Sequence, residues 1–162
     1  ANYSSDLTRM IPVNGKFTAR QKEIYNAVLD MKNFATSLLV PGNNWYDYHK
    51  ECGEFYTSKF LELGLLDKAD VQNQDKNWPA YKKYMMHGTS HHMGLDTHDY
   101  GILKDKFVEN MVFTVEPGIY LPAEGFGVRI EDDMVIQNSG PAFNLMKNIP
   151  IEVEEIEELM NS

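Results

Sequence analysis

The 162-residue chain divides into two halves with different hydrophobic patterns, and this division limits the folds that it can adopt. Residues 18–38 repeat apolar side chains at spacings of three and four, as one face of an amphipathic helix requires. This stretch begins with the capping-box pattern TARQ. Beyond residue 110, short apolar runs alternate with turns that contain Gly and Pro, which is typical of strands. Helices followed by strands predict an α+β architecture.

The remaining segments can be assigned from the same signals. Asn44 is expected to cap a second helix that stops at Gly64, and its aromatic face is interpreted as core packing. We expect residues 67–79 to form a loop. A strand broken by polar residues is predicted in segment 2–13, and further strands in segments 80–86, 111–121, 125–136 and 142–146. The last three are expected to pair as an antiparallel sheet, and a short amphipathic helix is predicted in 149–160.

Charge and cysteine content exclude several classes of protein. The net charge of −9 argues against nucleic-acid and anionic-membrane partners, because both need a basic surface. No apolar stretch approaches the length that spans a bilayer, and a single cysteine, Cys52, offers no disulfide framework. A reducing, cytoplasmic location is therefore expected. No signal peptide is recognised, and the start at Ala1 suggests that the chain is a fragment.

Four of the five histidines fall within one segment, HGTSHHMGLDTHD, at residues 87–99. His87 and His91 stand four residues apart, so one helical turn or a tight loop can direct both toward one point. Neutral imidazole is a common ligand of transition metals, but such sites also favour anionic ligands. The segment therefore predicts a metal site only if carboxylates join it.

Three acidic residues from other segments could supply those carboxylates. Glu116 is the only charge in the apolar run FTVEPGIY, where burial without a partner would be costly. Glu131 raises the same question in GVRIEDDMVI, and Asp6 lies in YSSDLTR, where Thr8 is expected to support it. Each has a plain alternative as a strand-end, edge-strand or turn residue. Carboxylates with one imidazole suit Mn²⁺, Co²⁺, Fe²⁺ or Zn²⁺, and bridging carboxylates favour a pair of metal ions.

The motifs YSSDLTR, HGTSHHMGLDTHD, VEPGIY and RIEDD together resemble the metal-dependent Xaa-Pro peptidases of the pita-bread fold, particularly Xaa-Pro aminopeptidase. The resemblance covers almost the whole chain, and the motifs follow the family's order. It implies a role for each matching residue. Those roles are metal ligands for Asp6, His91, Glu116 and Glu131, with Glu116 also handling a proton; substrate contact and catalysis for His87 and His98; substrate binding for Tyr120 and Arg129; and a peripheral position for His92.

The resemblance also implies a reaction. Two divalent metal ions, with Mn favoured over Co or Zn, would activate a water that attacks the carbonyl before a proline in second position. His98 would stabilise the oxyanion while Glu116 protonates the leaving nitrogen. Alternatives are a prolidase limited to Xaa-Pro dipeptides, a methionine aminopeptidase, a non-catalytic peptide-binding module and a metal-sequestering domain. The family further suggests a homodimer.

One family motif is absent. Members carry a further ligand aspartate in a DxGxEY segment, which would lie eleven residues before Asp6. Residues 1–162 are therefore expected to be a partial catalytic domain, truncated on its N-terminal side, that needs the missing N-terminal part as its partner. The chain by itself is expected to bind metal weakly and to be nearly inactive, since affinity depends on ligand number.

Overall fold

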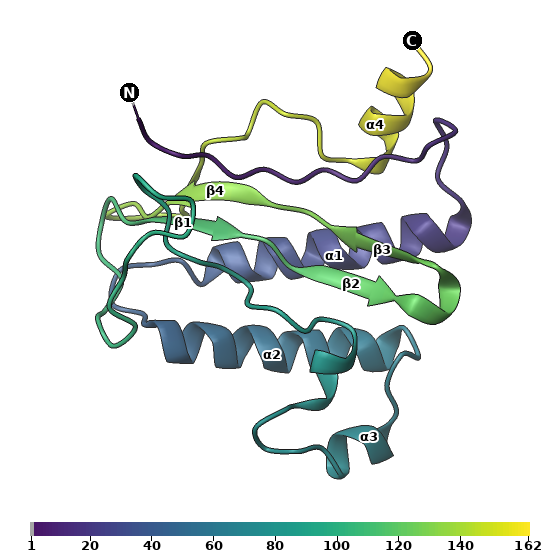
Figure 1. Cartoon of the computed structure of the whole chain (residues 1–162), viewed down its shortest axis with the longest axis horizontal. Helices are drawn as coiled ribbons and strands as arrows, with labels where there is room; N and C mark the ends of the chain where they lie inside the picture. The colour runs from purple at the N-terminus through teal and green to yellow at the C-terminus, as the bar shows by residue number, and fades with distance from the viewer. Residues whose placement is uncertain (1) are drawn as a thin grey trace.

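The structure is a computed structural model that describes residues 2–162. Two long helices precede a strand-rich half, and a short helix follows it (Figure 1). The elements in chain order are α1 (Ala19–Ser37), α2 (Trp45–Glu62), α3 (Lys68–Gln72), the 3₁₀ helix η1 (Ala80–Lys83), β1 (Val112–Val115), β2 (Gly118–Leu121), the 3₁₀ helix η2 (Pro122–Glu124), β3 (Phe126–Arg129), β4 (Asp132–Val135), β5 (Phe143–Asn144) and α4 (Val153–Met160).

Both long helices form where the apolar spacing and the capping residues predict them. Thr18 and Gln21 complete the capping box of α1, and Asn44 accepts hydrogen bonds from two backbone N–H groups at the start of α2. Gly64 ends the second helix with a φ of 66°, a backbone conformation that favours glycine. The side chains that both helices bury belong to one hydrophobic core with residues of the strands.

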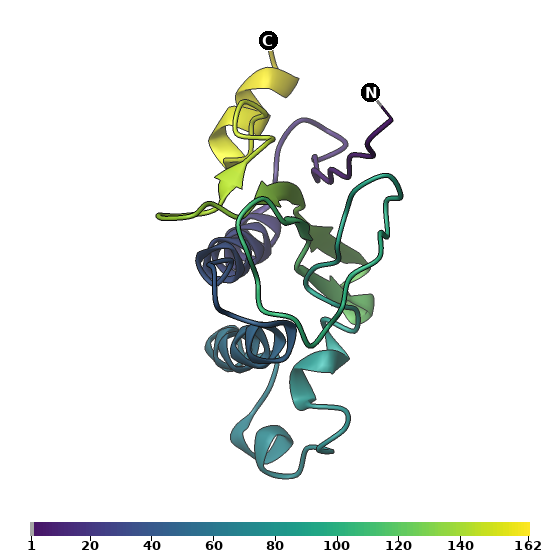
Figure 2. The same ribbon diagram turned by 90° about the vertical axis from the view of Figure 1, so that its left-hand side faces the viewer.

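The helices and strands form two layers. Helices α1 and α2 pack side by side, and α1 contacts β1, β2 and β3, so the strands cover one side of the helix pair (Figures 1 and 2). The N-terminal segment and α4 lie at the edge of the strand layer. Among residues 2–162 no helix combines the length and the apolar composition that crossing a membrane requires.

The strands differ from the prediction in one informative way. Segments 111–121 and 125–136 were each expected to form one strand, but each forms two, interrupted at residues 116–117 and 130–131. Strand β1 pairs antiparallel with β4, which pairs with the short β5, while β2 and β3 form a separate hairpin. Val115 is opposite Asp132 and Gly118 is opposite Arg129, so the two interruptions face each other.

Three smaller predictions were wrong. Segment 80–86 begins with η1 and contains no strand, and the predicted loop 67–79 contains α3, which Asp67 caps. Segment 2–13 forms no continuous strand and makes a single bridge, between Thr8 and Glu131. The predicted C-terminal helix is confirmed as α4, which buries Val153 and Ile156.

Candidate metal centre

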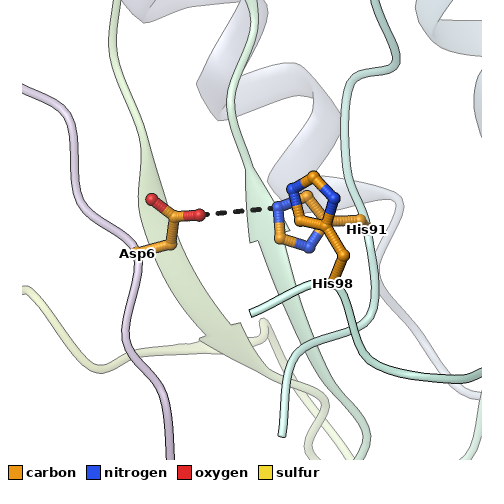
Figure 3. Close-up of side chains that lie close together, drawn as sticks. All are labelled: Asp6, His91 and His98. Carbon is orange, nitrogen blue, oxygen red and sulfur yellow. Dashed lines mark ion pairs between the residues drawn. The ribbon is translucent and has the colours of Figure 1, made fainter. Parts of the chain in front are cut away.

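Side chains from four separate segments meet at the facing interruptions of the strands. Donor atoms of His91, Glu116 and Glu131 lie within 4.8 Å of one another, and so do donor atoms of Asp6, His91 and His98. His91 is common to both groups: its Nε2 is 3.6 Å from Asp6 Oδ2 and 3.7 Å from Glu116 Oε1. Figure 3 shows Asp6 on the N-terminal segment facing the two imidazole rings. The sequence-predicted ligand candidates are therefore neighbours in space.

The backbone explains how each candidate ligand reaches this point. Glu116 follows β1 and Glu131 precedes β4, so both occupy the interruptions where the paired strands separate. The histidine segment runs beside β1, because Thr114 N–H donates to the His91 carbonyl and Glu116 N–H to that of Thr89. Asp6 is held near Glu131 by the isolated bridge between Thr8 and Glu131.

The His91 ring is oriented with its Nε2 toward the carboxylates. Its Nδ1 lies 3.0 Å from the carbonyl oxygen of His92. Because a carbonyl oxygen only accepts, Nδ1 must carry the proton and donate it. In the neutral ring, Nε2 then presents its lone pair to Asp6 and Glu116, as a metal ligand requires.

The electrostatics of the centre favour a bound cation. Burial, reinforced by the nearby Glu131 carboxylate, raises the pKa of Glu116 to about 7, and burial also raises the pKa of Glu131. Glu131 is only 1% exposed, and its Oε1 has no hydrogen-bond partner within residues 2–162. An unpaired buried carboxylate oxygen beside other carboxylates is costly unless a cation joins them. The residues therefore fit divalent metal ions.

The other two histidines of interest differ in their surroundings. His98 is exposed, and its ring centroid is 4.2 Å from that of His91, on the open side of the centre. His87 lies outside both donor groups. Its Nδ1 donates to the Gly88 carbonyl and its Nε2 accepts from the Tyr120 hydroxyl at 2.6 Å. Both ring nitrogens of His87 are thus engaged within the chain.

Tyr120 and Arg129 lie beside the centre on the β2–β3 hairpin. Arg129 Nε donates to Thr8 Oγ1 at 3.2 Å and is 3.9 Å from Glu131 Oε2. Both residues line a cavity of about 280 Å³, together with Thr8, Met10 and Gly127.

Sequence reasoning missed several supporting residues. Thr8 was expected to support Asp6, but its hydroxyl donates to Glu131 Oε2 at 2.6 Å, which corrects that expectation. The buried hydroxyl of Tyr48 on α2 contacts Ser90 Oγ at 2.6 Å, within the histidine segment. The same is true of Tyr56, which donates to Thr89 Oγ1 at 3.0 Å. The aromatic face of α2 is core packing, as predicted, but its hydroxyl groups also hold the histidine loop.

His92 points away from the metal centre. Its ring stacks on Trp45 and packs against Phe113, at centroid distances of 5.7 and 4.4 Å. The fifth histidine, His49, also packs against Trp45, at a centroid distance of 4.6 Å. Neither ring belongs to the donor groups around Asp6 and Glu131.

Comparison with known protein families shows which family the chain belongs to. The sequence pattern of "Metallopeptidase family M24" matches residues 1–138. The chain belongs to this family. It is 42% identical to a Xaa-Pro aminopeptidase of Haemophilus influenzae, over 99% of this chain and 40% of the relative, and 35% identical to Xaa-Pro aminopeptidase 3 of Homo sapiens, over 97% and 32%.

Solved structures agree with the sequence comparison. Zn-substituted aminopeptidase P of E. coli in complex with product superposes with a TM-score of 0.85 at 37% identity, covering 99% of this chain and 38% of that one. The α+β pita-bread fold expected from the resemblance is confirmed. The chain spans about 40% of the length of the Haemophilus relative, and less of the human one.

Proposed function

We propose that the protein carrying this chain is a metal-dependent peptidase that cleaves the bond between an N-terminal residue and a following proline. The observation that carries the proposal is the convergence of Asp6, His91, Glu116 and Glu131 from four segments on one point. The names of the relatives, Xaa-Pro aminopeptidases, give the substrate class.

In this proposal the four converging residues hold two divalent cations. Asp6, His91, Glu116 and Glu131 would supply the ligands that come from this chain. Bound cations of this kind polarise a carbonyl group and lower the pKa of water. Carboxylates with one imidazole suit Mn²⁺, and Co²⁺ and Zn²⁺ are the alternatives that metal analysis would distinguish. A further ligand from outside these residues, upstream of Asp6, is part of the proposal, with residues 1–162 as part of the catalytic domain.

The remaining residues act on the substrate. Glu116, whose carboxyl titrates near neutrality in the metal-free chain, carries a proton from the attacking water to the leaving imide nitrogen. His98, exposed beside His91, donates a hydrogen bond to the developing oxyanion. Tyr120 and Arg129 bind substrate at their shared cavity. His87 can contact substrate through Nε2 only by exchanging its Tyr120 partner.

The test is hydrolysis by the complete gene product supplied with Mn²⁺. A longer peptide with proline in second position, a Xaa-Pro dipeptide and a peptide with alanine in place of proline distinguish an aminopeptidase, a prolidase and a peptidase without proline preference. Glu116→Gln should lower kcat by roughly 10²–10⁴-fold, the usual contribution of a general acid or base. Glu124→Gln, which changes an exposed glutamate paired with Arg20, is the matched control and should leave kcat unchanged.

A complete gene product that binds divalent metal but cleaves none of these peptides would instead support the non-catalytic peptide-binding alternative. The proposal extends to a cytoplasmic homodimer, in which the single cysteine, Cys52, stays buried and reduced. Cell fractionation and light scattering of the purified protein test these two points.

A further inference from the structure

Arg9 joins three parts of the chain that lie far apart in the sequence. Its Nη1 donates to the carbonyl oxygens of Thr8 and Glu131, at 3.0 and 2.9 Å. Its Nη2 donates to Asp132 Oδ1 at 2.7 Å, and its Nε to the Pro150 carbonyl at 2.9 Å. The Arg9 side chain is only 12% exposed. One guanidinium thus binds the N-terminal segment, the start of β4 and the segment before α4.

Asp132 anchors this guanidinium from the core. Its carboxylate is fully buried and also accepts from Lys32 Nζ of α1 at 2.6 Å and from Asn144 Nδ2 of β5 at 2.7 Å. Replacing such buried ion pairs by apolar side chains is often neutral or stabilising, so stability alone gives little reason for three charged groups here. The network does fix the orientation of the Arg9 guanidinium and of the Asp132 carboxylate.

The orientation of the guanidinium matters because Arg9 contacts both residues of the bridge between Thr8 and Glu131. Thr8 and Glu131 form an isolated bridge, with backbone hydrogen bonds of 3.1 and 3.4 Å and no ladder on either side. Two backbone hydrogen bonds without a ladder hold two segments weakly, and the contacts of the Thr8 hydroxyl with Glu131 and of the Asp6 N–H with Asp133 add to them. Arg9 Nη1 contacts both carbonyl oxygens of that bridge, and the planar guanidinium keeps its donors in a fixed geometry.

The same bridge sets the spacing of two candidate metal ligands. Asp6 lies two residues before Thr8, and Glu131 is the other member of the bridge. In Figure 1 the N-terminal segment runs along β4, close to the chain that leads into α4. The hydrogen bonds of Arg9 join these three parts of the chain. A shift of the segment along β4 would separate Asp6 from Glu131.

We propose that Arg9 is a positioning residue of the metal centre: held by Asp132, which Lys32 also contacts, it fixes the N-terminal segment against Glu131 and so sets the distance between the Asp6 and Glu131 carboxylates. This inference rests on the proposed function, because it requires that the centre binds metal. Arg9 itself touches none of the donor atoms of the centre, so its effect is on metal affinity through the ligands.

The experiment compares Arg9→Gln with Arg20→Gln in the complete gene product. Arg20 is the matched control because it also pairs with carboxylates, Glu23 and Glu124, but at the surface and away from the centre. Mn²⁺ is titrated by calorimetry after chelator treatment, at a temperature where circular dichroism shows each variant folded. Arg9→Gln should raise the Kd for Mn²⁺ by about 10–100-fold, as the loss of partners that orient metal ligands usually does. Arg20→Gln should match the wild type.

Arg9→Lys is the second variant, and it decides the question if Arg9→Gln does not fold. Lysine keeps the charge beside Asp132 but cannot span two carbonyl groups with a rigid fork, so an intermediate rise in Kd is expected. A lower melting temperature with an unchanged Kd in the folded Arg9 variants would overturn the positioning role and leave the proposed function intact. A wild type that binds no Mn²⁺, cobalt or zinc would overturn both.

Discussion

The hydroxyl group of Thr8 helps to hold the carboxylate of Glu131 in place. Thr8 Oγ1 is the hydrogen-bond donor to Oε2, and Oε1 has no partner in the described part of the chain. Thr8→Val keeps the shape of the side chain and removes that donor. It should lower the free energy of unfolding by about 1–3 kcal/mol, the usual cost of leaving a buried polar group unsatisfied. Urea unfolding in the presence of a chelator measures this change.

Thr8→Ser is the control for that substitution, because serine keeps the hydroxyl and loses only a methyl group. The serine variant should lie closer to the wild type than the valine variant does. Equal stability of the two variants would show that the Thr8 hydroxyl contributes nothing to holding Glu131.

At the scale of single residues, the sequence predicts candidate site residues better than it predicts their hydrogen-bond partners. Glu116 could be selected because it is the only charge in an apolar strand segment, and Glu131 because it lies between apolar ends of a predicted strand. The partners of Thr8 and His87 could not be predicted in the same way. A side chain reaches several neighbours, and tertiary packing alone determines that Thr8 donates to Glu131 and that His87 accepts from Tyr120.

At the scale of whole elements, periodicity predicted α1, α2 and α4 accurately, missed the short α3, and predicted the strands only in part. An alternating apolar pattern continues through residues 116–117 and 130–131, so a strand that stops and resumes looks like one strand. Pro117, which has no N–H for a ladder, was the one local signal of an interruption. The break in residues 130–131 has no such signal, because it arises from the bridge to Thr8 in a distant segment.

The attachment of α4 to the start of α1 provides a pH-dependent prediction. The carboxylate of Glu157 on α4 accepts from Phe17 N–H at 2.8 Å and from Lys22 Nζ at 2.9 Å. Both bonds lower the pKa of Glu157 in the folded chain, and the bond with Lys22 has the larger effect. Glu157→Gln should therefore reduce the melting temperature above the ordinary glutamate pKa of about 4.3.

The sign of the effect follows from the lowered pKa. The stabilisation by ionised Glu157 is fully present above the unfolded pKa and is lost as the pH falls through the folded pKa. The difference in melting temperature between wild type and Glu157→Gln should thus shrink in acid. Melting curves from pH 7 to pH 3 measure it, with Glu158→Gln, an exposed neighbour, as control. A difference that is constant across this range would contradict the ionic attachment.

At the scale of the whole molecule, the candidate metal centre depends on nearly the full length of the chain. Its candidate ligands extend from Asp6 to Glu131, and helix α2 holds the histidine loop from behind through its tyrosine hydroxyls. Composition and spacing could identify these residues as candidate ligands, and the family resemblance could suggest a role for each. Their convergence required the long-range contacts that only the folded chain contains.

Metal binding should therefore stabilise the complete gene product as a whole. A ligand that binds only the folded state at 100 times its Kd adds about 2.7 kcal/mol. For domains of 150–250 residues, each kcal/mol shifts the melting temperature by about 2–4 °C, so saturating Mn²⁺ should raise it by roughly 5–10 °C. Calorimetry with Mn²⁺, and again after addition of EDTA, measures the shift and its reversal.

Adjacent histidines provide the matched comparison for this shift. His91→Ala removes the imidazole shared by both donor groups and should abolish most of the rise in melting temperature. His92→Ala removes a ring that packs on Trp45 and Phe113, so it should lower the melting temperature without metal but preserve the shift. An equal shift in His91→Ala and the wild type would place the bound metal elsewhere. His91 belongs to both donor groups, so a site built from these four segments cannot keep its affinity for metal without that imidazole.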